Sequence, residues 1–316
     1  MKYLMIITTI SLTATSVMAK PSGLTSHYDM VTRLVALENE DASSGRGRLK
    51  VGSIGKSVLG KDIVLVTLKN PSTENTSTKK LFIICRQHGD EPATTEAMMK
   101  LIRDMDTDNS TQTLDLLSKV SFYIVPMVNP DGADAFTRRN ANGADLNRDW
   151  LYLSQPETRA VKEMVDIVKP DIILDEHELS PGNNRSDFVE TAGISSGTLP
   201  QVVAESERLQ NLVIGMLRVH NMKVRAAHIE DQCPARLAHR FFPIFEGIPA
   251  LLFESRQAGA RQNRLDYRED LHITATMTVA KCLAGYDGDL VQRIADHDAG
   301  RYSQRTPASA NQGYGR

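Results

Sequence analysis

Five short apolar runs, rich in β-branched residues and bounded by turn formers, recur along the chain. They lie at residues 61–68, 81–85, 121–128, 172–174 and 250–253. Runs of this length and composition are typical of buried strands. Apolar residues at helical spacing lie between them, at residues 91–105, 156–168, 201–220 and 270–284. Strands that alternate with helices predict an α/β fold with a layered sheet.

Polar side chains come directly after four of these runs. His88 and Glu91 follow the second run, Asn129 follows the third, His177 follows the fourth, and Glu254 follows the fifth. In open α/β sheets, ligands bind outside the carboxyl ends of the strands. We therefore expect these side chains, together with nearby arginines, to meet at one edge of the sheet.

The His88 and Glu91 pair has the spacing of metal ligands held across a tight turn. With a second, distant histidine, such a pair gives the His₂Glu set of hydrolytic zinc sites, which leaves a fourth position for water. The pair alone is a weak signal, because His228 and Asp231 have the same spacing. Taken singly, His177 could equally be a buried structural histidine, and Glu254 could form an ion pair with Arg256.

A longer motif at residues 138–149 is far more specific. It reads Arg-x-Asn-x-x-Gly-x-Asp-Leu-Asn-Arg from Arg138 onward, and an Asn-Pro-Asp-Gly segment precedes it at residues 129–132. With these pieces in this order, the chain resembles the zinc metallocarboxypeptidases of the carboxypeptidase A/B type over about residues 50–258. The resemblance implies a three-layer α/β/α fold with a mixed, largely parallel central sheet of about eight strands.

The resemblance also implies which residues form the metal site. His88, Glu91 and His177 would hold one Zn²⁺ ion, and Glu254 would be the general base that takes a proton from the attacking water. Zinc lowers the pKa of a bound water to about 7, so this chemistry suits neutral pH. His177 is flanked by Glu176 and Glu178. Each is either a partner that orients the imidazole or a solvated side chain, and we expect Glu178 to be solvated.

The resemblance implies one further catalytic residue, Arg138, and two substrate-binding residues, Asn147 and Arg148. Arg138 would stabilise the developing oxyanion, with Arg139 as the alternative guanidinium. Asn147 and Arg148 would hold the terminal carboxylate, for which a planar guanidinium is well matched. The family's loop tyrosine has no counterpart in residues 223–247, where phenylalanines stand instead.

The two ends of the chain look different from its centre. Residues 1–19 have the basic start, short apolar run and small-x-small end of a secretory signal peptide, with an uncleaved membrane anchor as the alternative. We expect export to the periplasm or the medium, without a stable membrane anchor after cleavage. A lead-in at residues 20–44 would precede a catalytic domain at residues 45–290. A polar, disordered tail is expected at residues 291–316, and a surface loop at residues 180–200.

Net charge and cysteine content bear on nucleic-acid binding and on disulfide bonds. The formal net charge is −2 over 316 residues, whereas a nucleic-acid binder normally shows a basic domain or stripe. We therefore expect no nucleic-acid partner. Three cysteines are too few for a disulfide framework and allow one bridge at most.

The sequence thus predicts an exported zinc metallocarboxypeptidase that hydrolyses the C-terminal bond of peptides with a free terminal carboxylate. Two alternatives are a zinc-dependent deacylase of N-acyl amino acids and a non-catalytic module that binds peptide termini. The basic segment at residues 236–240 lies where the family lines its pocket for the terminal side chain. It favours an acidic terminal residue, such as those of cell-wall peptides, unless its arginines lie on the surface.

Overall fold

The computed structural model describes residues 23–73, 78–180, 183, 185–194, 197–229, 235–257 and 264–305. Eight strands are present among these residues: β1 (Leu49–Lys56), β2 (Asp62–Leu68), β3 (Lys79–Cys85), β4 (Val120–Val125), β5 (Ile172–Leu179), β6 (Phe188–Ala192), β7 (Arg225–Ile229) and β8 (Ala250–Arg256). The longer helices are α1 (His27–Ser43), α2 (Ala93–Thr107), α3 (Thr111–Lys119), α5 (Pro156–Val168), α6 (Pro200–Val219), α8 (Leu265–Leu283) and α9 (Asp287–Arg305). Shorter turns of helix are η1 (Pro71–Thr73), α4 (Pro130–Ala135), η2 (Leu146–Arg148), α7 (Ala238–Phe241) and η4 (Phe242–Glu246).

The strands form one mixed sheet in the order β1-β2-β4-β3-β5-β8-β6-β7. The four pairs β3–β4, β3–β5, β5–β8 and β6–β7 are parallel, and the other three are antiparallel. The predicted α/β fold with a mixed central sheet of about eight strands is therefore confirmed. The parallel strands β3, β5 and β8 lie side by side in the middle of the sheet. Their carboxyl ends consequently share one edge.

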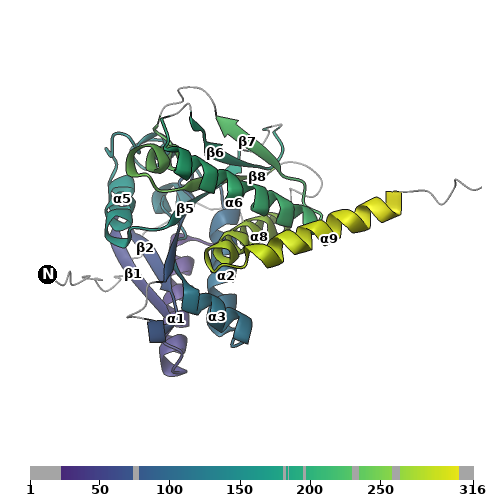
Figure 1. The fold of residues 1–316 in the computed structure, drawn as a ribbon. Helices are drawn as coiled ribbons and strands as arrows, with labels where there is room; N and C mark the ends of the chain where they lie inside the picture. The colour runs from purple at the N-terminus through teal and green to yellow at the C-terminus, as the bar shows by residue number, and fades with distance from the viewer. Residues whose placement is uncertain are drawn as a thin grey trace, which may run out of the picture.

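Helices cover both faces of the sheet and make the three layers (Figure 1). Alternate residues of β3 enter different cores, since side chains alternate along a strand. Leu81 and Ile83 pack with residues of α1, α2, α6 and α8. Phe82 and Ile84 pack with residues of α5 and α7 and with Trp150. Apolar burial on both faces explains why the central strands read as nearly continuous apolar runs.

The surface loop predicted at residues 180–200 is wrong in its centre. Strand β6 (Phe188–Ala192) lies inside the sheet between β8 and β7, and all five of its residues are buried. The strand contains Glu190 and Thr191, so its apolar run is too short to stand out. Its burial depends on the two neighbouring strands, which come later in the sequence.

The disordered tail predicted from residue 291 is wrong as far as the end of α9. This helix begins at Asp287 and continues to Arg305, and Ile294 packs against the core residues of α6. Gly215 of α6 makes room for the Ile294 side chain, which would collide with a Cβ atom at position 215. An ion pair of 2.8 Å between Arg218 and Asp298 joins the same two helices.

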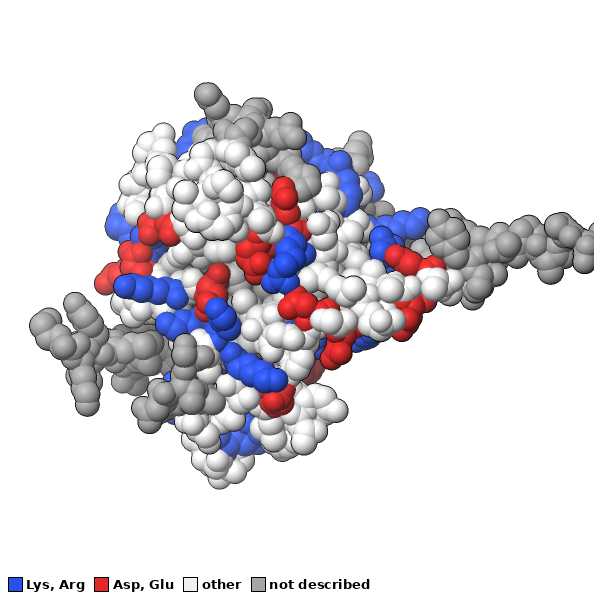
Figure 2. All heavy atoms as spheres, viewed as in Figure 1, with Lys and Arg blue, Asp and Glu red and all other residues white. Residues whose placement is uncertain are grey.

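The predicted signal peptide at residues 1–19 lies outside the described residues. The lead-in is folded from α1 onward, with Met30 and Leu34 fully buried in the core. Among the described residues, no helix combines the length and the apolar character needed to cross a membrane. Cys85 and Cys282 are free and buried, whereas Cys233 is outside the described residues. Acidic and basic side chains lie interspersed over the face in Figure 2.

Candidate metal centre

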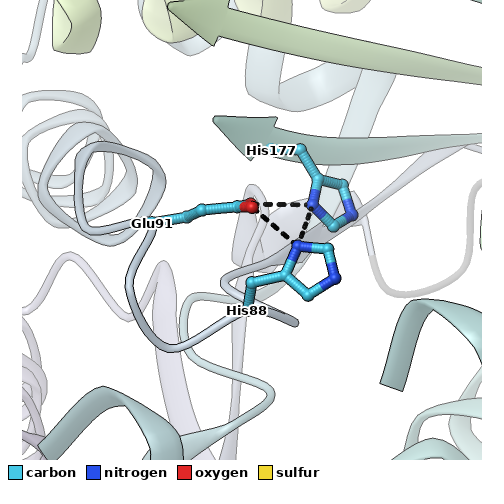
Figure 3. A group of neighbouring side chains, drawn as sticks. All are labelled: His88, Glu91 and His177. Atoms are coloured by element: carbon cyan, nitrogen blue, oxygen red, sulfur yellow. Dashed lines mark hydrogen bonds and ion pairs between the residues drawn. The ribbon is translucent and has the colours of Figure 1, made fainter. Parts of the chain in front are cut away.

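Three buried side chains converge on one point at the carboxyl edge of the central strands. His88 Nδ1 lies 2.6 Å from one carboxylate oxygen of Glu91, and His177 Nδ1 lies 2.8 Å from the other. The two Nδ1 atoms are 3.2 Å apart. Figure 3 shows the Glu91 carboxylate and the two imidazoles directed toward one another. The structure therefore brings together the three residues that the sequence singled out as metal ligands.

The donor atoms suit a single zinc ion. Zinc bonds of about 2.0–2.2 Å to nitrogen and oxygen place tetrahedral ligand atoms about 3.3 Å apart. The two Nδ1 atoms lie 3.2 Å apart, close to that value, and each faces a different Glu91 oxygen at the shorter distance of 2.6 or 2.8 Å. Two neutral imidazoles and one carboxylate also form the donor set of hydrolytic zinc sites. Within the described segments, His88, Glu91 and His177 are thus the group that fits a zinc ion.

The chain reaches this geometry through a tight turn after β3. The Glu91 amide donates to the His88 carbonyl at 3.2 Å, which closes the turn ahead of α2. Gly89 is required here, because a Cβ atom would lie 2.0 Å from the backbone of Gly132. The third donor, His177, lies near the carboxyl end of β5, which pairs with β3 in parallel.

Two aspartates that we did not predict contact the imidazoles at Nε2, the ring nitrogens that do not face Glu91. Asp145 Oδ1 lies 3.0 Å from His88 Nε2, and Asp175 Oδ1 lies 3.0 Å from His177 Nε2. Such partners fix which ring nitrogen is protonated and leave Nδ1 free to bind a metal. Asp175 could have been found from its spacing, since residues two apart on a strand point to the same face.

The charged groups of the site lower the pKa of its glutamate and raise the pKa of its buried histidine. Burial would raise the pKa of Glu91, but His88 and His177 outweigh it and hold the pKa well below its usual range. Burial would lower the pKa of His177, yet the Asp175 and Glu91 carboxylates raise it well above the ordinary value. The site therefore stabilises positive charge between its carboxylates, as a cation-binding site must.

Glu254 lies beside this group. It is the register partner of His177 on the adjacent strand β8. Its Oε2 atom is buried and has no hydrogen-bond partner, and burial raises the pKa of its carboxyl to about 7. No ion pair with Arg256 is present in the described part of the chain, so the structural alternative for Glu254 has no support. A buried carboxylate oxygen without a partner is costly unless it has a functional reason.

Of the three residues predicted to act on the substrate, Arg138 and Asn147 contact the metal-site residues. Arg138 Nη1 lies 3.5 Å from Glu91, whereas the exposed Arg139 donates to the Gly143 carbonyl at 2.9 Å. The structure therefore places Arg138, and not Arg139, beside the metal ligands. Asn147 is buried 3.1 Å from His177 Nε2, and Arg148 follows it with an exposed side chain.

The prediction that Glu178 is solvated is wrong. Glu178 is 1% exposed, accepts a hydrogen bond of 2.7 Å from the Ala93 amide and forms a 3.0 Å ion pair with Arg268. Glu176 is also buried, against α8. Both side chains point to the face of the sheet opposite His177, because side chains alternate along β5.

Other predicted details fall outside the site. Phe241 and Phe242, in the segment that lacks the family tyrosine, are buried and pack edge to face. The competing pair loses its support, because His228 lies within β7 and Asp231 is outside the described residues.

Comparison with known proteins supports the resemblance. Residues 39–180 match the model of the zinc carboxypeptidase family. The probable carboxypeptidase 2 of Trichophyton verrucosum is 35% identical over 119 residues, which are 37% of this chain and 23% of that protein. The zinc carboxypeptidase of Saccharothrix mutabilis subsp. capreolus is 29% identical over 149 residues, covering 42% of this chain and 34% of its own. The chain thus spans about a quarter to a third of the length of these relatives.

Solved structures share the fold. A metallo-carboxypeptidase from Burkholderia cenocepacia superposes with a TM-score of 0.68 at 23% identity, covering 81% of this chain and 68% of the other. A metallo-carboxypeptidase from Pseudomonas aeruginosa, in complex with (2-guanidinoethylmercapto)succinic acid, gives a TM-score of 0.64 at 23% identity, with the same coverage. At these identities the likeness confirms the α/β fold.

Proposed function

We propose, from the membership of residues 39–180 in the zinc carboxypeptidase family, that the protein is a zinc-dependent metallocarboxypeptidase that removes the C-terminal residue of peptides. One observation carries the proposal: His88, Glu91 and His177 converge beside Glu254, whose Oε2 atom is buried without a partner. This set leaves one position of a tetrahedral metal for water, as hydrolysis requires.

The chemistry divides between the metal and this chain's own side chains. Bound zinc would lower the pKa of a water molecule to about 7 and polarise the scissile carbonyl. Glu254 accepts the proton of the attacking water and returns it to the leaving amine. Its burial and its raised pKa make it a stronger base than an exposed glutamate.

The surrounding polar groups hold the substrate. Arg138 is 35% exposed and lies next to Glu91, so its guanidinium can donate to the oxyanion that forms on the scissile carbonyl. Loss of one such donor typically costs about 3–4 kcal/mol of transition-state stabilisation. Asn147 and Arg148 are proposed to hold the terminal carboxylate, and the Asn147 amide oxygen is fixed by the Ala238 amide at 3.1 Å.

We further propose that the terminal residue carries a carboxylate, as in cell-wall peptides. Support comes from Arg240, which is buried and pairs with Glu190 at 2.7 Å through Nη2. Its Nε and Nη1 atoms remain buried without partners. An acidic side chain would satisfy them. Hydrolysis of peptides with apolar termini, but not of muropeptides, would refute this specificity.

Export and the number of metal ions belong to the proposal as well. The basic start, apolar run and small-residue end of residues 1–19 support secretion. One His₂Glu set among the described residues supports a single zinc ion. N-terminal sequencing of secreted protein and metal analysis test these two points.

The decisive experiment combines metal content with substrate choice. Purified protein should contain about one zinc per chain and hydrolyse N-blocked dipeptides that have a free carboxylate. Activity confined to N-acetyl- or N-succinyl-amino acids would instead identify a deacylase. Protein that neither contains zinc nor takes it up would identify a non-catalytic binding module.

A further inference from the structure

Helix α8 buries a polar stripe against the strand that carries His177. Arg268, His272 and Thr276 are four residues apart and therefore lie on one face of the helix. All three are buried. A helix that packs on a sheet normally turns apolar side chains inward. These buried polar side chains therefore need hydrogen-bond or ion-pair partners, and their presence calls for a functional explanation.

The partners of His272 lie immediately next to the metal-site residues in the sequence. Its Nδ1 atom hydrogen-bonds Glu176, the residue before His177. Its Nε2 atom lies 3.0 Å from the hydroxyl of Ser255, the residue after Glu254. His272 thus joins β5 to β8 beneath the metal site, on the opposite face of the sheet.

Arg268 reaches the metal site through Glu178. Its guanidinium lies 3.0 Å from Glu178 Oε1, while Glu178 Oε2 accepts the Ala93 amide at the start of α2. In return, the backbone amide of Glu178 donates to Glu91 Oε2 at 3.0 Å. Arg268 therefore holds a carboxylate that fixes the start of α2, just after Glu91, to β5, which carries His177.

We propose that Arg268 and His272 are positioning residues of the metal site. Arg268 acts through Glu178 on the separation of Glu91 and His177, and His272 acts through Glu176 and Ser255 on the alignment of His177 with Glu254. The inference rests on the proposed zinc site but not on peptidase activity. Groups that hydrogen-bond a metal ligand directly typically contribute 10- to 100-fold to metal affinity. Arg268 and His272 act one contact further out, so we expect smaller contributions of about 3- to 10-fold from each.

The sign of the effect separates positioning from simple electrostatics. Removal of the Arg268 charge makes the region more negative, and Coulomb attraction alone would then tighten cation binding. If Arg268 instead positions the metal ligands, its removal misplaces them and weakens zinc binding. Arg268→Met is expected to weaken zinc binding about 3- to 10-fold. Arg264→Met, which removes an exposed arginine at the start of the same helix, is the matched control and should leave the zinc dissociation constant unchanged.

Zinc dissociation constants are measured by chelator competition on the full chain, with thermal unfolding recorded in parallel. Unchanged or tighter zinc binding in folded Arg268→Met overturns the role of Arg268. Glu178→Asp provides a second variant should Arg268→Met not fold, because it keeps the charge and withdraws the carboxylate from the Ala93 amide. It is expected to weaken zinc binding as well, and wild-type affinity in this variant contradicts the inference.

His272 is tested by a pair of variants. His272→Phe keeps a ring against Phe253, which it now contacts edge to face, but loses both hydrogen bonds. His272→Gln retains a donor for Glu176 and should recover part of the zinc affinity, along with the visible spectrum of the cobalt-loaded protein. Equal spectra and affinities for both variants and wild type would overturn the role of His272. Wild-type protein without zinc affinity would overturn the inference together with the proposed function.

Discussion

His177 and Glu254 lie directly opposite each other on the neighbouring parallel strands β5 and β8. Paired residues of adjacent strands direct their side chains to the same face of the sheet. The pairing of β5 with β8 therefore places the proposed metal ligand and the proposed general base next to each other on one face of the sheet. A shift of one residue would turn one of the two side chains to the opposite face.

The first prediction concerns Glu254. Glu254→Gln keeps the size of the side chain and removes the base, so we expect kcat to fall by 10²–10⁴-fold or more. Because Glu254 is not a proposed ligand, zinc content should stay at the wild-type level. Steady-state kinetics and metal analysis on the same preparation check this. Glu163→Gln, an exposed change on α5, is the control, and loss of zinc in Glu254→Gln would show a structural role.

The second prediction is a pH dependence. Burial raises the pKa of Glu254 to about 7 in the protein without metal, and the positive charge of bound zinc lowers it from there. The carboxylate is active only when ionised, so kcat/KM should fall as the pH drops through a value at or below about 7. A pH–rate profile in buffers of constant ionic strength measures this limb. An acid limb centred above pH 8 would contradict the assignment.

The third prediction concerns recognition of the substrate terminus. Arg148→Ala removes a charged donor from the proposed carboxylate site, and such hydrogen bonds contribute about 1.5–3 kcal/mol. We expect kcat/KM to fall about 10- to 150-fold for peptides with a free carboxylate. Amidated peptides should change little. Arg139→Ala is the matched control, because Arg139 is also exposed but donates to Gly143; equal losses in both variants would remove the special role of Arg148.

Much of the fold and site followed from local sequence signals. The runs that became β3, β5 and β8 are apolar because both faces of the central sheet are covered. The residues after them were predictable as neighbours because carboxyl ends of parallel strands share an edge. The spacing of His88 and Glu91 could likewise be read directly, since one turn holds both.

The features that were missed depend on contacts between distant segments. β6 is a strand because β7 and β8 flank it, and its own sequence is short and partly polar. The burial of Glu178 depends on Arg268, ninety residues later, and on the start of α2. Charged residues are rarely buried without a partner, so the sequence next to His177 suggests solvation until that partner is known.

The last prediction concerns stability away from the site. Asp106 is fully buried beside Asp41, and burial raises its pKa to about 6, although Arg46 lies 2.9 Å away. An unfolded aspartate has a pKa of about 3.9. The folded protein therefore keeps a proton that the unfolded chain releases between about pH 4 and pH 6. As the pH rises through this range, the titration of Asp106 reduces the free energy of unfolding by up to about 3 kcal/mol.

Asp106→Asn removes this titration and keeps the shape of the side chain. Relative to wild type, the variant should become more stable by up to about 3 kcal/mol on going from pH 4 to pH 7. Denaturant unfolding at several pH values measures the difference, and titrating groups far from Asp106 cancel in the comparison. Asp108→Asn, an exposed change nearby, should not show this trend, because its pKa is lowered by hydrogen bonds from Thr113 and Ser110. A constant difference between Asp106→Asn and wild type across this range would mean that Asp106 is ionised in the folded protein throughout.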